Sequence, residues 1–273
     1  MSRAYRRQWL KQHDKYENRA RIIFQRAFKT VALTIPFSEM QEDNYKVFTE
    51  FYITRDVVFK AYLEVYTQVG GIHGKRVGRE INKQINEKDF TFDKFLSVFQ
   101  RTLIAWLNQN GGQRITEVRG TYIAYINQLI ANGVRDGKTM PQIATGIKKL
   151  IASRNFYRWQ ALRIARTETT TASNYAASVA SSVSGVLMDK VWLSGQDPRT
   201  RRPPDSKYDH FSMNLVKVPL DKPFTVSGEK MMFAGDPKGS AGNVINCRCT
   251  VAQVVRRDKN GRIIRVPEFA TLP

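Results

Sequence analysis

Hydrophobic and polar residues follow a helical period through the first two thirds of the chain. No Gly or Pro occurs before Pro36, and the apolar residues between Ile22 and Val31 recur at close to helical spacing. Such spacing gives a helix one apolar face. We therefore expect a long helix over residues 3–33.

Aromatic side chains predict a second helix over about 39–69. Its aromatic residues recur at intervals of three, four and seven: Tyr45, Phe48, Tyr52, Phe59, Tyr62 and Tyr66. This stripe favours a buried helix face over a platform for stacked bases. The glycine-rich stretch "VGGIHGKRVG" (69–78) then predicts a loop between helices, with His73 as a lone histidine. It contains no G-x-G-x-x-G and follows no clear strand, so it does not indicate a nucleotide-binding loop.

Four further helices are expected before residue 184. One over about 89–110 ends at Gly111–Gly112, and the next ends near Gly137. Thr139, followed by Pro141 and Gln142, is typical of the start of a short helix that reaches about residue 151. The last, over 157–183, is rich in Ala, Ser and Thr, and such small side chains allow close packing.

The pattern changes at Gly185, where strand-like alternation and turn residues replace the helical period. "VLMDKVWLS", "LVKVPL", "FTV", "KMMFA" and "CRCTVAQVV" read as strands or extended pieces, and Asn260-Gly261 predicts a hairpin turn. We expect an α+β fold, a helical N-terminal region followed by a small β-rich C-terminal domain with hairpins. The expected domains are residues 1–155 and 156–273.

Positive charge is the main compositional feature. The chain carries 44 Lys and Arg against 24 Asp and Glu, a net charge of +20. Such a surface attracts polyanions and favours non-specific, salt-sensitive contact with nucleic acid. Seven residues of the basic first helix are candidate nucleic-acid contacts: Arg3, Arg6, Arg7, Lys11, Arg19, Arg21 and Arg26. A solvated face, a membrane surface and a partner helix are the alternatives for this helix.

Neither a secreted nor a membrane protein is indicated. No stretch approaches 18 apolar residues, and a polar segment follows the first arginines in place of a signal-peptide core. Two cysteines in 273 residues do not form a disulfide framework. We expect assembly in a reducing cytoplasm and no membrane partner.

Arg166, Thr167 and Glu168 form the first cluster that suggests chemistry. Adjacent helical residues point in different directions, so this triplet favours a salt bridge that anchors the helix to the β-rich unit over acid–base catalysis. A second cluster, over residues 192–210, contains Asp197, Arg199, Arg201, Arg202, Asp205, Asp209 and His210. These residues could cut a phosphodiester, bind phosphate, or order the loop by ion pairs.

Cys247 and Cys249 form the third cluster. On a strand, residues two apart share a face, so both sulfurs would lie side by side. Buried thiols, a metal site and a redox pair are the three interpretations, and packing is favoured because free cysteine is commonly buried. A metal site would use His210, Cys247 and Cys249, with Asp197, Asp209 or Asp236 as oxygen ligands. The C-x-C spacing is a poor match to standard zinc motifs.

Taken in order, these motifs resemble the phage Mu F-like head morphogenesis family over roughly 160–255. The motifs are "ARTET", "WLSGQDPRTR", "DSKYDHFSMN", "FAGDP" and "NCRC". The resemblance covers these residues of the family pattern: Arg166, Thr167, Glu168, Trp192, Asp197, Arg199, Arg201, His210, Gly235, Asp236, Pro237, Asn246, Cys247, Arg248 and Cys249. The chain departs from the pattern at Leu215, where the family often has Gly, and in a longer loop that includes Pro203 and Pro204.

The resemblance implies a minor head protein of a tailed phage, located in the virion head near the portal. Its expected roles are head assembly and DNA packaging or delivery. Its expected partners are the portal protein, phage DNA bound non-specifically and other head proteins. We expect no enzymatic activity and no cofactor, with zinc as the alternative. The rival functions are a phosphodiesterase or nuclease acting through His210 and Asp197, and a nucleic-acid-binding module unrelated to phage heads.

Overall fold

The computed structural model describes residues 3–86 and 91–266, with the side chains of residues 3 and 4 also outside the description. The helices are α1 (Arg3–Thr34), α2 (Tyr45–Tyr52), α3 (Arg55–Val65), the π-helical turn η1 (Tyr66–Gly70), α4 (Gly71–Ile85), α5 (Phe92–Asn110), α6 (Gly112–Arg135), α7 (Met140–Ala152), α8 (Arg158–Ser182) and α9 (Ala241–Val244). The strands are β1 (Met188–Leu193), β2 (Lys217–Pro219), β3 (Phe224–Val226), β4 (Glu229–Met231) and β5 (Thr250–Val255).

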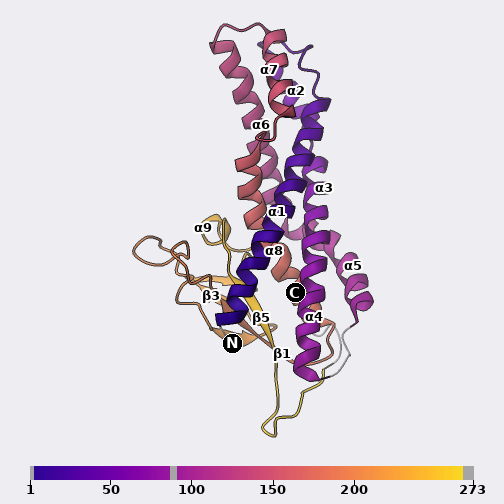
Figure 1. Ribbon diagram of the computed structural model, residues 1–273, viewed down its shortest axis with the longest axis vertical. Coiled ribbons are helices and arrows are strands. Elements are labelled where there is room, and N and C mark those ends of the chain that lie inside the picture. The colour runs from indigo at the N-terminus through magenta and orange to yellow at the C-terminus, as the bar shows by residue number, and fades with distance from the viewer. Residues whose placement is uncertain (1–2, 87–90, 267–273) are drawn as a thin grey trace.

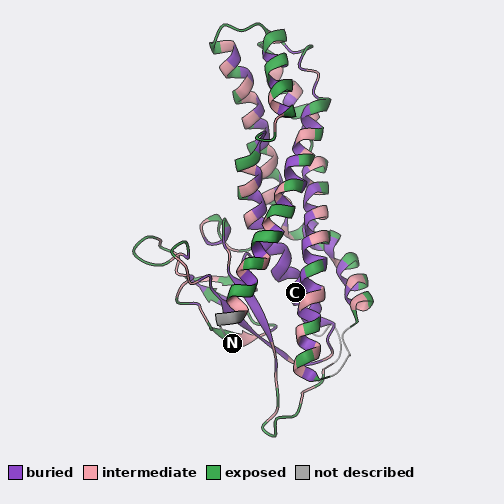
Figure 2. Cartoon of the chain, in the orientation of Figure 1, coloured by how far each residue is buried: buried purple, intermediate pink, exposed green. Residues whose placement is uncertain are grey.

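The helices form an elongated column, and the strands pack beside its lower part (Figure 1). Helix α8 packs against α1 and also contacts α4, η1 and β5. Every side chain of α8 from Thr167 to Ser182 is buried, and the part of this helix that is visible behind α1 is purple (Figure 2). The small residues predicted for this helix therefore serve as its packing surface on all sides.

The strands form two small antiparallel sheets. The larger has the order β2-β1-β5, with Met188 opposite Val255 and Asp189 opposite Pro219. In the smaller sheet β3 pairs with β4. The predicted turn at Asn260-Gly261 is present, because the Gly261 amide donates to the Asp258 carbonyl and Arg257 pairs with Ile263 across it. The predicted α+β class is confirmed.

The single helix predicted over 39–69 is wrong. The chain breaks between α2 and α3, where Ile53 leaves the helix and is fully buried. The side chain of Arg119, on α6, stabilises this break by donating from Nε to the Ile53 carbonyl at 2.6 Å. A tertiary hydrogen bond thus replaces a helical one, which the local aromatic pattern could not indicate.

The loop predicted over residues 69–78 is also wrong, because this stretch lies in η1 and α4. A Cβ on Gly70 would lie 2.6 Å from Cζ of Phe99, and one on Gly74 would lie 2.1 Å from Cζ of Phe95. Both phenylalanines belong to α5. These two glycines therefore lie under aromatic rings of a neighbouring helix. The close packing that they allow outweighs the poor helix propensity of glycine.

The remaining helices agree with prediction to within a few residues. The start of α7 has the expected capping box, in which the Thr139 amide donates to Oε1 of Gln142 at 2.9 Å. Residues 87–90, near the predicted start of α5, lie outside the described residues. The domain division at residue 155 stays a prediction.

One hydrophobic cluster runs from Trp9 in α1 to Val255 in β5. None of the described helices is long and apolar enough to cross a bilayer.

Candidate functional site

The buried polar face of α8 holds the irregular segments of the β-rich part. Thr170 Oγ1 donates to the Cys247 carbonyl, and Thr171 Oγ1 donates to the Gly235 carbonyl at 2.7 Å. Gly235 has a φ of +82°, and a Cβ there would lie 3.0 Å from Cγ2 of Thr170. Glycine is thus required both by the backbone angle and by the close approach to α8.

Asn174 makes the densest set of these contacts. Its Nδ2 donates to the Ala234 carbonyl at 2.9 Å, and its Oδ1 accepts from Thr250 Oγ1 and the Val251 amide, each at 3.0 Å. Asn174 is fully buried. One amide side chain therefore joins the turn before residue 235 to the start of β5, using both its donor and its acceptor.

Helix α1 also contacts the segment 246–249. Trp9 Nε1 donates to the Arg248 carbonyl at 2.9 Å. His13 Nε2 lies 3.0 Å from Thr170 Oγ1, and because Thr170 gives its proton to the Cys247 carbonyl, the histidine is the donor in this pair. Burial first, then the charges of Arg248, Arg166 and Arg199, lower the pKa of His13 to about 3. His13 is therefore neutral, and its Nδ1, 3.9 Å from Glu17 Oε2, forms no ion pair at neutral pH.

Glu168 is a buried carboxylate that joins three helices. It accepts from the Tyr66 hydroxyl at 2.8 Å and pairs with Arg114 of α6 at 3.4 Å. Arg166 pairs instead with Glu17 of α1 at 3.0 Å. The predicted salt bridge from this triplet to the β-rich unit is wrong, because both ion pairs join helix to helix. Arg114 also reaches the β-rich part, with Nη2 3.5 Å from the Gly235 carbonyl.

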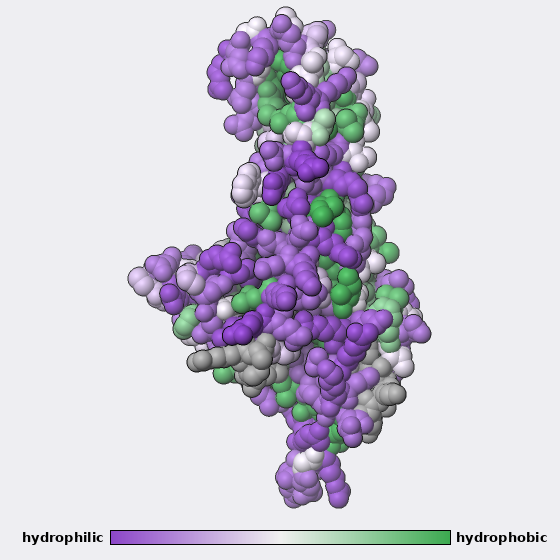
Figure 3. Space-filling view, viewed as in Figure 1, coloured by the Kyte–Doolittle hydropathy of each residue, from purple (hydrophilic) through white to green (hydrophobic). Residues whose placement is uncertain are grey.

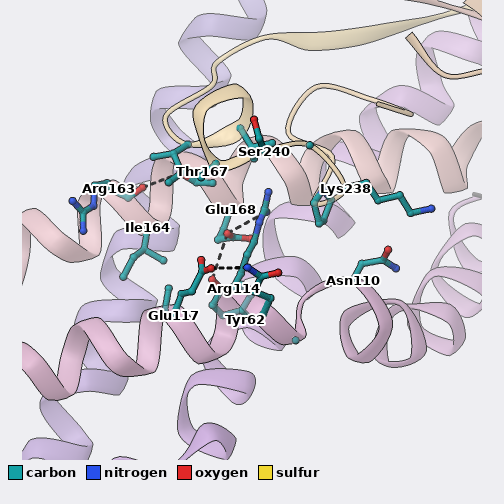
Figure 4. Close-up of a pocket in the computed structure, with 18 of the residues that line it drawn as sticks. Tyr62, Asn110, Arg114, Glu117, Arg163, Ile164, Thr167, Glu168, Lys238 and Ser240 are labelled. Atoms are coloured by element: carbon teal, nitrogen blue, oxygen red, sulfur yellow. Dashed lines mark hydrogen bonds and ion pairs between the residues drawn. The ribbon is translucent and has the colours of Figure 1, made fainter. Parts of the chain in front are cut away.

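A pocket of about 1010 Å³ lies between α6, α8 and the segment 237–245. Figure 4 shows Arg114 and Glu168 facing each other on its wall, with Tyr62 beside them. Its described lining has three basic side chains, Arg114, Arg163 and Lys238, and three acidic ones, Glu117, Glu168 and Glu229. The balanced charge gives this pocket no preference for an anionic ligand.

Two signature aspartates shape turns. Asp236 accepts from the amides of Met232 at 2.7 Å and Lys238 at 3.0 Å. Asp197 accepts from the Arg199 amide at 3.0 Å and pairs with the Arg248 side chain. Burial tends to raise the pKa of Asp197, but Arg248 outweighs this effect and lowers it.

The second arginine of the loop makes a backbone contact, because Arg201 donates from Nη2 to the Ile245 carbonyl. Arg199, by contrast, is exposed. The Asn246 backbone has a φ of +60°, a left-handed conformation that asparagine tolerates better than most residues. Its amide donates to Thr167 Oγ1 at 3.1 Å. The signature thus consists largely of residues that hold loops against α8.

His210, Cys247 and Cys249 converge in one buried cluster. Nδ1 of His210 lies 3.5 Å from Sγ of Cys247 and 3.6 Å from Sγ of Cys249. Nε2 of the same ring lies 2.8 Å from Oδ1 of Asn243. The ring of Trp192 lies edge-on to the imidazole, at a centroid distance of 5.8 Å. These atoms can bind a thiophilic metal ion or share protons between sulfur and nitrogen.

The three groups shift one another's pKa. Burial tends to lower the pKa of His210, but Cys247 and Asn243 outweigh it and raise that pKa. Hydrogen bonding to Cys249 and the neighbouring His210 lower the pKa of Cys247. The same contact with Cys247, together with burial, raises the pKa of Cys249. Cys247 is therefore the thiol that ionises first.

Part of the expected geometry of this cluster is wrong. Cys247 and Cys249 precede β5, which begins at Thr250, so they do not lie on a strand. Their sulfurs nevertheless face one histidine. The proposed oxygen ligands Asp197, Asp209 and Asp236 do not belong to the group that could hold a metal among the described residues. The three described contacts of the His210 ring nitrogens go to Asn243, Cys247 and Cys249, and none of them goes to Asp197.

The basic residues of α1 differ in their surroundings. Arg6 donates to Asn214 Oδ1, Arg21 to Gln25 Oε1, and Arg26 pairs with Glu64. The side chain of Arg3 lies outside the described residues. Arg7, Lys11 and Arg19 are exposed, as is Lys15, a residue that the sequence interpretation omitted. These four recur every fourth residue and form what we call the basic stripe.

Comparison with protein families places the signature in context. Residues 124–252 match the model described as Phage Mu protein F like protein. Over this segment, just under half of the chain, the protein is similar to the Mu F-like family. The resemblance inferred from the motifs is thereby confirmed, and the match extends upstream over α7 and half of α6, where no motif was recognised. No curated protein and no solved structure matches the chain.

Similarity to the Mu F-like family over residues 124–252 indicates a bacteriophage protein of head morphogenesis and a component of the virion. Sequence reasoning missed several residues that build the Mu F-like region: Trp9, His13, Arg114, Thr170, Thr171, Asn174 and Asn243. The residues of α8 could have been found from the sequence, because Thr, Ser and Asn are spread along Thr167–Ser182. Polar side chains so distributed do not gather on one solvent-facing side of a helix.

Proposed function

We propose that this Mu F-like protein is a minor head protein at the portal vertex, acting in head assembly and in DNA packaging or delivery. The match of residues 124–252 to the family carries the proposal. The α8-centred core supports a structural role, because its buried polar residues are engaged in holding loops. The helical column then presents surfaces for protein and DNA.

The basic stripe is the surface that we assign to DNA. Arg7, Lys11, Lys15 and Arg19 are exposed and make no ion pair with the described acidic side chains. Lys and Arg free of acidic partners can neutralise phosphates without first breaking a salt bridge. The face in Figure 3 is mostly hydrophilic, which agrees with a surface that meets solvent and polyanion.

Helix α2, near the upper end of the column in Figure 1, is the surface that we assign to the portal protein. Val47 and Phe51 lie one turn apart on it and are 69% and 72% exposed. Leu33, in the last turn of α1, is 67% exposed. Large apolar side chains that remain this exposed favour a protein–protein contact.

Co-purification with the portal protein of the same phage tests the proposal. The full chain should co-purify with assembled portal, and Val47→Lys with Phe51→Lys should reduce the bound amount about tenfold or more, since buried apolar anchors dominate interfaces. Gln128→Lys, at an exposed polar position of α6, is the control and should bind as the parent does. Absence of the chain from heads imaged at the portal vertex would contradict the proposal.

A further inference from the structure

The His210 side chain has a defined tautomer in the buried thiol cluster. Asn243 Nδ2 donates to the Val226 carbonyl at 3.2 Å, so the amide oxygen of Asn243 faces His210. An oxygen can only accept, so Nε2 of His210 carries the proton of this contact. In the neutral ring the lone pair of Nδ1 then faces the two sulfurs.

Hydrogen bonding alone does not explain why both thiols lie close to the single lone pair of His210 Nδ1. A neutral Nδ1 accepts one linear S–H bond, yet both sulfurs lie at nearly the same distance, 3.5 and 3.6 Å. A disulfide between the cysteines would leave Nδ1 buried without a donor. All three residues are at most 3% exposed, so water from bulk does not replace the missing partner.

The distances fit a shared metal ion. With Zn–S bonds of about 2.3 Å and Zn–N bonds of about 2.0–2.1 Å, a tetrahedral angle places sulfur and nitrogen about 3.5–3.6 Å apart. The two observed S···N distances are 3.5 and 3.6 Å, and the three ligand atoms all lie within 4.8 Å of one another. The hydrogen bond from Nε2 to Asn243 is the outer contact by which proteins commonly orient a histidine ligand.

We propose that Cys247, Cys249 and His210 bind one zinc-type divalent cation. Two thiolates and one imidazole are donors that Zn²⁺ prefers, and within the described residues they leave one tetrahedral position for a fourth ligand. The ion joins the loop 194–216, which carries His210, to the segment 245–249 that docks on α8. Its binding therefore stabilises loops that have little regular structure of their own.

Metal content of the full-length protein tests the proposal. Protein purified without immobilised metal should contain close to one zinc per chain by elemental mass spectrometry. Cys247→Ser, Cys249→Ser and His210→Gln should each lose most of it, and Asn243→Ala should weaken affinity about 10–100-fold. His73→Leu is the matched control, because His73 is a buried histidine outside the cluster and its loss should leave the zinc content unchanged.

Wild-type measurements keep the test independent of whether a variant folds. Removal of zinc by a chelator should lower the melting temperature, and added Zn²⁺ but not Mg²⁺ should restore it. Co²⁺ alone, added to the chelated protein, should give a thiolate-to-cobalt charge-transfer absorption. Folded, reduced wild-type protein that neither contains zinc nor takes up Co²⁺ would overturn the proposal.

Discussion

At the scale of single residues, the buried histidines of the helical column are held neutral. His73 lies between the rings of Trp9 and Tyr16, with centroid distances of 5.3 and 5.9 Å, and neither of its ring nitrogens has a hydrogen-bond partner among the described residues. Burial, followed by the charge of Arg76 and by His13, lowers the pKa of His73 to about 3. His13 has a pKa lowered to about 3 as well.

These two histidines make stability depend on pH. The unfolded chain binds a proton at each histidine below about pH 6.5, whereas the folded chain binds it only near pH 3. Their contribution is therefore fully present above about pH 6.5 and is lost as pH falls toward 3, at about 1.4 kcal/mol per pH unit for each histidine.

His73→Leu should remove one of these two terms. The free energy of unfolding is measured by denaturant titration at several pH values between about 6 and 4. Its slope against pH should be smaller in the variant than in the parent by about 1.4 kcal/mol per pH unit, which corresponds to one proton. Ile72→Leu, at the adjacent and 41% exposed position, should keep the parent slope. Equal slopes for His73→Leu and the parent would show that His73 is protonated in the folded state.

Leu215 shows how a family departure is accommodated. Its φ is +71°, the left-handed region that favours glycine, and its amide donates to the Trp192 carbonyl at 2.8 Å. The residue is 51% exposed, so its side chain meets no crowded surroundings. The backbone geometry expected for glycine is thus retained with leucine at that position.

At the scale of elements, close approach of helices decides where glycine lies. Gly74 of α4 packs under the Phe95 ring, whereas Gly120 of α6 is exposed and has nothing within 4 Å of its Cβ direction. The same substitution in a helix interior should therefore have opposite effects at these two positions.

Gly74→Ala should destabilise the protein by about 1–3 kcal/mol, because the added methyl forces the buried Phe95 ring to move. Gly120→Ala should stabilise it by up to about 1 kcal/mol through helix propensity alone. Thermal and denaturant unfolding measure both. A stabilising Gly74→Ala would mean that α4 and α5 do not pack as closely as described.

At the scale of the whole molecule, net charge attracts DNA but the arrangement of charges decides where it binds. The chain has a net charge of +20, so any polyanion is attracted. A specific DNA-contact surface can be distinguished from this general attraction by comparing two sets of substitutions that remove the same charge at different places. The basic stripe of α1 allows that comparison.

Replacement of Arg7, Lys11, Lys15 and Arg19 by Gln should weaken DNA retardation and reduce the slope of log affinity against log salt by about 2–4. The control replaces four exposed basic residues elsewhere, Lys46, Arg101, Lys148 and Lys149, with the same change in charge. It should alter the slope little. Equal effects of both sets would contradict a contact at the stripe.

The same DNA should remain intact with Mg²⁺, Mn²⁺ or Zn²⁺. Cleavage that disappears in His210→Ala would instead support the phosphodiesterase alternative. Because His210 contacts Asn243 and two thiols, its loss is also expected to disturb the loops around it. Asp197→Asn therefore serves as a second variant in the cleavage assay, since nuclease action through Asp197 would be lost there as well.

The sequence alone determined the features that depend on local order along the chain. Helical periodicity, the capping residues at Thr139 and the change at Gly185 established the α+β class and most helix bounds, because these patterns act over a few residues. The order of short motifs predicted the resemblance to the Mu F-like family, which the match over residues 124–252 confirmed. The hairpin at Asn260-Gly261 followed from turn chemistry.

Only the tertiary structure decided which distant residues meet. Gly74 belongs to a helix because a ring from α5 covers it, and Ile53 leaves one because Arg119 supplies a hydrogen bond. Cys247 and Cys249 face His210 in a segment that is held against α8 by a hydrogen bond from Thr170. Such contacts join residues far apart in the chain, and their free energy outweighs local propensity once the core has formed.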